Sequence, residues 1–234
     1  MISNNQIKKF ASIRNYFPKL DNKGGLLIPS SLKFEDTDFM KYRHIPVNWE
    51  IKSVDEDYLP DEFSPMAVKL VDLFRRKTID LPYELMLVFD YKTGDLIYCF
   101  VNDGGSGDEV FGVVDEDILF GKNICIIHNH PIEYGSSPSS DNFQILGLDF
   151  QDYEILSSSD EIWIIESKEL LSESEINDIK DNLQQLYLYS SEIAEGMNSD
   201  ENEIIKQCDE LYGELLLKYI NNHPLNIKLN KQRL

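Results

Sequence analysis

The chain has 234 residues, of which 42% are hydrophobic and 27% are charged, and its formal net charge is -20 at pH 7. These values are ordinary for a soluble globular protein that can bury a core. The acidic balance disfavours nucleic-acid binding, which depends on lysine and arginine neutralising phosphates. A basic substrate or partner suits such a surface better.

The sequence contains no apolar run of the length that spans a bilayer, and its first residues, MISNNQIKKFASIRNYF, lack the apolar segment of a signal peptide. The three cysteines, Cys99, Cys125 and Cys208, form no C-x-x-C pair. Cys99 and Cys125 lie in apolar, strand-like runs, where cysteine usually behaves as a small hydrophobe. We therefore expect a protein of a reducing compartment, the cytoplasm, without membrane attachment.

Residues 1–60 contain turn signals and short apolar runs but no chemical motif, and we interpret them as an N-terminal extension of unclear fold. The next segment, SPMAVKLVDLFRRK, predicts a helix. Ser64 is a suitable N-cap, Pro65 suits the first helical position, and an apolar face follows. Three basic residues stand in its last turn, where their positive charge interacts favourably with the helix dipole.

The middle of the chain alternates between strand and turn patterns. LPYELMLVFDYKTGDLIYCFVN (81–102) predicts a β-hairpin, EVFGVV (109–114) a short strand and KNICIIHNH (122–130) a buried central strand. NFQILGLDF predicts a short helix that Ser139 or Ser140 can cap, and DYEILSSSDEIWIIES predicts two further strands. This order predicts an α+β fold, an α/β-type sandwich of one mixed sheet flanked by helices.

From residue 169 the pattern becomes helical. Residues 169–222 predict a C-terminal helical hairpin with broad apolar faces, and Ser172 with Glu175 fits a capping box. We expect this hairpin to pack against the rest of the protein; oligomerisation or partner binding is the alternative. Residues 223–234 are polar and basic, and we expect a tail that frays.

One stretch, ICIIHNHPIEYGSSPSSDN (124–142), concentrates residues that can bind a metal. His128 and His130 are two residues apart at the end of the central strand, so their side chains should project from the same face. Asp141 stands at the start of the following helix. Two imidazoles and one carboxylate form a three-ligand zinc set with a fourth position open for water, which is typical of hydrolytic sites.

These residues resemble the JAMM (JAB/MPN+) zinc metalloprotease motif, in which a remote Glu precedes H-x-H-P, a gap, Ser, two residues and Asp. The resemblance covers about residues 81–167, and the bacterial, phage JAB and RadC-like branches are the most similar. It implies a JAMM-like catalytic domain over residues 61–168 that binds Zn2+ through His128, His130 and Asp141. It further implies hydrolysis of a peptide or isopeptide bond.

The resemblance also implies two catalytic side chains. A glutamate on a neighbouring strand takes the proton of the zinc-bound water, and Glu84 matches this position by order and distance. Glu109 and Glu133 are the rivals. A serine supports the oxyanion, and we assign this role to Ser139.

The motif departs from the family at one point, because Pro138 stands where the serine is expected. Two registers follow. In the first, Asp141 is the ligand and Ser139 or Ser140 replaces the family serine. In the second, Ser139 is that serine and Asn142 takes the ligand position, which implies a weak or absent metal site. We favour the first register, since a carboxylate stands at the usual gap.

The sequence therefore predicts a zinc-dependent metallopeptidase or isopeptidase acting on a protein or peptide, such as the tail of a ubiquitin-like protein. The alternative is a JAMM-fold interaction module without hydrolysis, with an acidic surface and C-terminal helices that bind partners. RadC-like proteins share the letters H-N-H-P and have been linked to DNA repair. The charge of -20 argues against a DNA-binding role.

Overall fold

The computed structural model describes residues 19–20, 26–27, 54, 58–79, 81, 84–101, 116–131, 135–145, 151–167 and 169–234. The strands are β1 (Lys19–Leu20), β2 (Leu26–Leu27), β3 (Leu85–Asp90), β4 (Leu96–Val101), β5 (Ile124–Asn129), β6 (Gln151–Ser157), β7 (Glu161–Ser167) and β8 (Ile227–Arg233). The helices are α2 (Pro65–Thr78), α3 (Glu116–Leu119), α4 (Ser140–Ile145), α5 (Glu173–Met197) and α6 (Glu201–Asn222). Most of the N-terminal extension and the strand expected at 109–114 lie outside the described residues.

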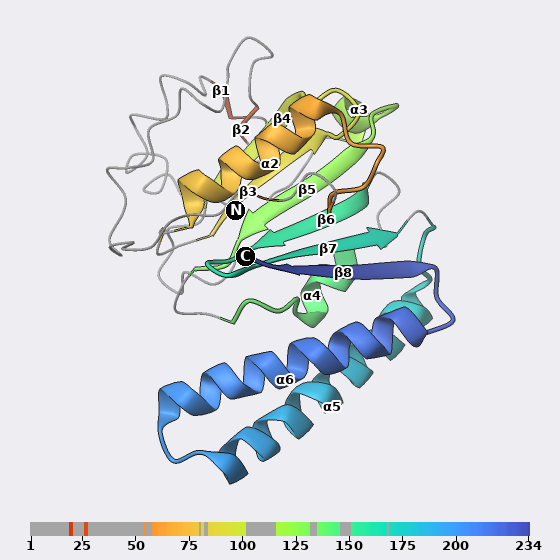
Figure 1. Cartoon of the computed structure of the whole chain (residues 1–234). Coiled ribbons are helices and arrows are strands. Elements are labelled where there is room, and N and C mark those ends of the chain that lie inside the picture. Colours follow the sequence, from red (N-terminus) through yellow and green to blue (C-terminus); the bar gives the residue numbers. More distant parts are fainter. Residues whose placement is uncertain are drawn as a thin grey trace.

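The strands form one mixed sheet in the order β1-β2-β4-β3-β5-β6-β7-β8 (Figure 1). β5 and β6 are parallel, and the other neighbouring pairs are antiparallel. The predicted α+β fold is confirmed, including the hairpin of β3 and β4 and the central position of β5. β5 therefore has β3 on one side and β6 on the other, and its end meets side chains from both.

Helix α2 lies across one face of this sheet (Figure 1). Ser64 caps it by accepting a hydrogen bond from the backbone N–H of Ala67, and Pro65 occupies its first turn, as predicted. Its buried face packs on inward-facing residues of β3 to β7, which form the larger core together with the segment before the helix. Alternation along β5 directs Cys125 and Ile127 to this face, and Ile126 and His128 to the opposite one.

The opposite face of β6 to β8 is covered by α4 and the helical hairpin of α5 and α6 (Figure 1). Ser172 and Glu175 form the predicted capping box at the start of α5. The apolar faces of both helices share one core with β6, β7 and β8, with Trp163 fully buried at its centre. The predicted packing of the hairpin against the rest of the protein is confirmed, because its two helices share a core with strands β6, β7 and β8.

The fraying tail predicted for residues 223–234 is wrong. Ile227–Arg233 forms strand β8, which pairs antiparallel with β7 along its whole length. Ile227 and Leu229 are buried in the core under the hairpin, whereas Lys228 between them and Asn230 after them are exposed. The side chain of Asn221 also makes two hydrogen bonds to the backbone of Leu229. Its Nδ2 donates to the Leu229 carbonyl, and its Oδ1 accepts from the Leu229 N–H. Backbone pairing with β7, burial of two alternating apolar side chains and the Asn221 hydrogen bonds together account for a strand in this polar segment.

The three cysteines are buried free thiols. None of the helices in the described part of the chain is both long and apolar enough to cross a membrane.

The alternating burial along β8 predicts that substitutions at two adjacent residues differ in their effect on the free energy of unfolding. Leu229→Ala should lower the free energy of unfolding by about 2–5 kcal/mol, because it removes a fully buried side chain from the core. Asn230→Ala, on the exposed face of the same strand, should change it by less than about 0.5 kcal/mol. Urea denaturation of the full chain measures both. Equal, near-zero effects would mean that the strand does not form in solution.

Candidate metal centre

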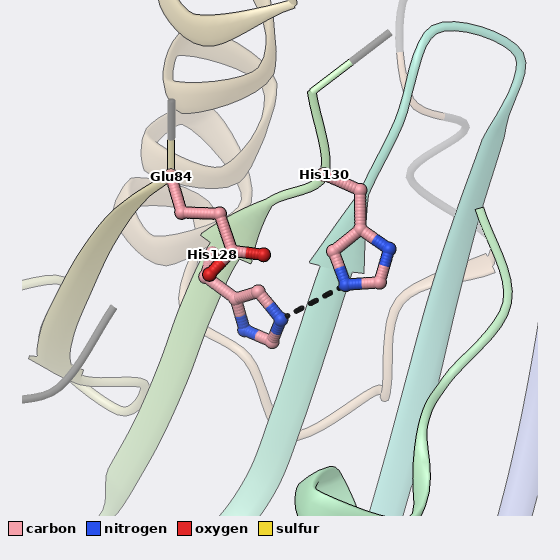
Figure 2. A group of neighbouring side chains, drawn as sticks. All are labelled: Glu84, His128 and His130. Atoms are coloured by element: carbon pink, nitrogen blue, oxygen red, sulfur yellow. Dashed lines mark hydrogen bonds between the residues drawn. The ribbon is translucent and has the colours of Figure 1, made fainter. Parts of the chain in front are cut away.

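Strand pairing brings three metal-binding side chains together at the end of β5. His128 pairs with Met86 across the antiparallel β3–β5 ladder, and Glu84 precedes Met86 by two residues, so Glu84 and His128 lie on the same face. His130 follows directly after the strand. Figure 2 shows the Glu84 carboxylate and the two rings converging, and one ligand atom from each residue lies within 4.8 Å of the others. This group could bind a metal ion.

The two imidazoles face each other through their Nε2 atoms, which are 3.2 Å apart (Figure 2). Two nitrogens bound to one tetrahedral zinc at ordinary Zn–N lengths are separated by about 3.3 Å. The outer nitrogens contact oxygens: Nδ1 of His130 lies 2.8 Å from the Gly135 carbonyl, and Nδ1 of His128 lies 3.4 Å from Oε1 of Glu154. When both Nδ1 atoms carry the proton, both Nε2 lone pairs point at the same position, where a shared cation removes their repulsion.

Burial favours the neutral form of both imidazoles. It lowers the pKa of His128 well below its ordinary value, and the nearby His130 ring, beside which a second positive charge would be repelled, lowers it further. Burial also lowers the pKa of His130, although the Gly135 carbonyl and Asp209 oppose this shift. A neutral imidazole is the form that binds a metal, so protons compete weakly for this site near neutral pH.

The structure does not bring Asp141 into this group. Its side chain is 67% exposed and lies 3.8 Å from the ammonium of Lys180 on α5. Asn142 is buried instead: its Nδ2 lies 3.4 Å from Nε2 of His128 and donates to Oε1 of Glu154 at 3.1 Å. The favoured register, with Asp141 as a ligand, is therefore not supported by this geometry. Asn142 lies beside His128, as the second register expects, but it presents Nδ2 to the ring while its Oδ1 accepts from Ser139.

The cause of this register is the way helix α4 begins. Oγ of Ser139 accepts a hydrogen bond from the N–H of Asp141, while the N–H and hydroxyl of Ser139 donate to Oδ1 of Asn142. This pattern is similar to a capping box in that the side chain of Asn142 accepts from the Ser139 backbone, but the N–H bonded to Oγ of Ser139 is that of Asp141 rather than Asn142. The predicted cap at Ser139 or Ser140 thus falls on Ser139. Ser139 holds Asn142 in place, and its oxyanion role stays a prediction.

The sequence analysis missed one residue of the site, Glu154. Its side chain is 1% exposed on β6, and burial raises its pKa to about 8, against the effect of hydrogen bonds from Asn142 and Gln151. It contacts Nδ1 of His128, the position from which a carboxylate commonly orients a metal-binding histidine. The signal was weak, because Glu154 alternates with Tyr153 and Ile155, a pattern typical of a solvent-exposed position, and in the sequence Leu156 alone indicates that the glutamate's face is buried.

The rival bases Glu109 and Glu133 lie outside the described residues. Compared with protein-family models, curated proteins and solved structures, the chain gives no significant match. What the site can do must therefore be argued from its own geometry.

The two registers predict opposite rankings for the loss of stability caused by substituting Asp141 and Asn142. Asn142→Ala should destabilise the protein by about 1–3 kcal/mol, because it removes one of the hydrogen bonds to the buried carboxyl group of Glu154. Asp141→Ala should cost less than about 1 kcal/mol, the range of an exposed ion pair. Urea denaturation measures both variants. A larger cost for Asp141→Ala would place the aspartate inside the site.

Proposed function

We propose that this protein is a zinc-dependent metallopeptidase or isopeptidase. The observation that carries the proposal is the pair of Nε2 atoms 3.2 Å apart, with the Glu84 carboxylate within 4.8 Å of both rings. Two neutral imidazoles and one carboxylate are a ligand set that suits zinc and leaves a coordination position open for water. When bound, zinc lowers the pKa of a bound water and polarises a substrate carbonyl.

In this proposal His128 and His130 hold the metal through Nε2, and their orientation is fixed by Glu154 and the Gly135 carbonyl. Glu84 has two carboxylate oxygens. One can complete the ligand set, since Asn142 contributes no charge at the position of the family aspartate. The other can accept a proton from water and return it to the leaving amine.

The substrate class follows from the resemblance and from charge. The proposal takes an amide bond in an extended tail, such as that of a ubiquitin-like protein or a short peptide, as the target. The net charge of -20 favours a tail with basic residues over an acidic one. The first test uses a mixed peptide library and ubiquitin-like fusions.

The variant Glu84→Gln tests whether Glu84 acts as the base or has only a structural role. The variant keeps a neutral oxygen near the metal but cannot accept a proton, so hydrolysis should fall by about 10²–10⁴-fold. The exposed residue Glu169 provides a matched control, and Glu169→Gln should keep full activity. Chelation should abolish hydrolysis, and zinc should restore it. Full activity of Glu84→Gln in protein that retains zinc would show that another group is the base.

One observation favours a second candidate, an interaction module without hydrolysis. Asn142 stands beside His128 where an acid would complete the usual ligand set. The two candidates differ in the metal content of the purified protein. The peptidase contains close to one zinc per chain, whereas the module contains far less.

The variant Asn142→Asp tests the missing charge directly. A carboxylate beside His128 should raise zinc affinity by at least about ten-fold, equivalent to about 1.4 kcal/mol. The nearby Glu154 can stay protonated, since its pKa is already raised to about 8 by burial. Competition with a chromophoric chelator measures the affinity. Zinc binding by the variant alone would support the interaction module, and no zinc binding by either protein would exclude a metal site.

A further inference from the structure

The loop of residues 135–138, which precedes α4, is held by helix α6, which belongs to the C-terminal hairpin. The Asp209 carboxylate accepts hydrogen bonds from two successive backbone amides, with the N–H of Ser136 3.0 Å from Oδ2 and that of Ser137 3.2 Å from Oδ1. The hydroxyl of Ser136 has one proton to donate and lies between Oδ2 of Asp209 at 2.9 Å and Oε2 of Glu161 at 2.8 Å, whereas the hydroxyl of Ser137 donates to the Asp209 carbonyl at 3.3 Å. One carboxylate thus holds two residues of this loop.

The approach is close at two glycines, where an added Cβ would require the neighbouring side chains to shift. A Cβ added to Gly135 would lie 2.6 Å from Oδ1 of Asp209, and one added to Gly213 would lie 2.7 Å from Oγ of Ser137. One turn along α6 from Asp209, the hydroxyl of Tyr212 donates to the Pro138 carbonyl. Asp209, Tyr212 and Gly213 therefore form one face of α6 that holds residues 135–138.

The same loop orients His130. The Gly135 carbonyl lies 2.8 Å from Nδ1 of His130, directly before the two residues that Asp209 holds. The position of that carbonyl decides whether Nδ1 keeps the proton and Nε2 keeps the lone pair that faces His128. A displacement of the loop would remove the partner that fixes the tautomer.

We propose that Asp209 is a positioning residue for the metal centre, which acts through the Gly135 carbonyl on His130. This inference rests on the proposed zinc site and extends it to the helical hairpin. Asp209 contributes no ligand. It fixes the loop so that the second imidazole is ready to bind, as outer partners of metal-binding histidines commonly do.

The test measures metal affinity of the full chain with a graded series at Asp209. Asp209→Ala should weaken zinc and cobalt binding by about ten-fold or more, within the range for outer partners of metal ligands. Asp209→Asn keeps one acceptor oxygen and should give an intermediate loss. Glu210→Gln is the matched control, because it removes a charge from the same helix at a side chain that pairs with the exposed Arg233. The control should bind metal like the wild type.

A second measurement keeps the inference separate from the proposed function. In metal-free, nitrogen-labelled protein, NMR should show His130 protonated at Nδ1 in the wild type and in Glu210→Gln. Asp209→Ala should give a mixture of tautomers while the protein remains folded. The chain has four histidines, so the resonances can be assigned by substitution. A role limited to stability would lower the urea midpoint without changing this tautomer signal.

Gly135→Ala provides an independent variant. Its Cβ would push the loop away from Asp209, so it should also weaken metal binding, and by less in the Asp209→Ala background, where the contact is gone. If wild-type protein binds no metal but the tautomer shifts in Asp209→Ala, the zinc proposal fails and the positioning role stands. Unchanged tautomer and affinity in both Asp209 variants would overturn the inference.

Discussion

The candidate centre depends on the burial of His128. An imidazole shielded from water needs a partner for each ring nitrogen, because an unpaired polar atom in the interior is costly. Glu154 lies beside one nitrogen, and His130 and Asn142 lie beside the other. These partners come from β6, from the end of β5 and from α4, so one ring fixes the relative positions of three segments.

Strand periodicity explains why much of this arrangement could be predicted. A two-residue spacing places both histidines on one side of β5, and the β3–β5 pairing places Glu84 near them. The register of the following acid could not be predicted in the same way. It depends on which serine caps α4, and a shift of one residue rotates a helical side chain by about 100°. Capping by Ser139 therefore turns Asn142 inward and Asp141 toward Lys180.

The C-terminal segments show a different limit of sequence patterns. The two helices could be predicted from the helical spacing of their apolar residues. In β8, only Ile227 and Leu229 mark the buried side. Asp209 could not be singled out from the sequence. The whole chain has 42 acidic residues, and several of them lie on α6. The importance of Asp209 comes from the approach of α6 to residues 135–138, which depends on glycine at two positions that lie far apart in the sequence.

The buried thiols carry a consequence for any metal that this protein binds. In the folded chain Cys99, Cys125 and Cys208 are enclosed, and burial raises the pKa of each. Unfolding exposes all three, and thiolates are strong zinc ligands. Zinc then has affinity for the unfolded chain as well, which reduces the stabilisation that it gives to the native state. Heat resistance gained from zinc will therefore understate how tightly the native site holds the ion, whereas a cation that prefers oxygen and nitrogen to sulfur will report it more faithfully.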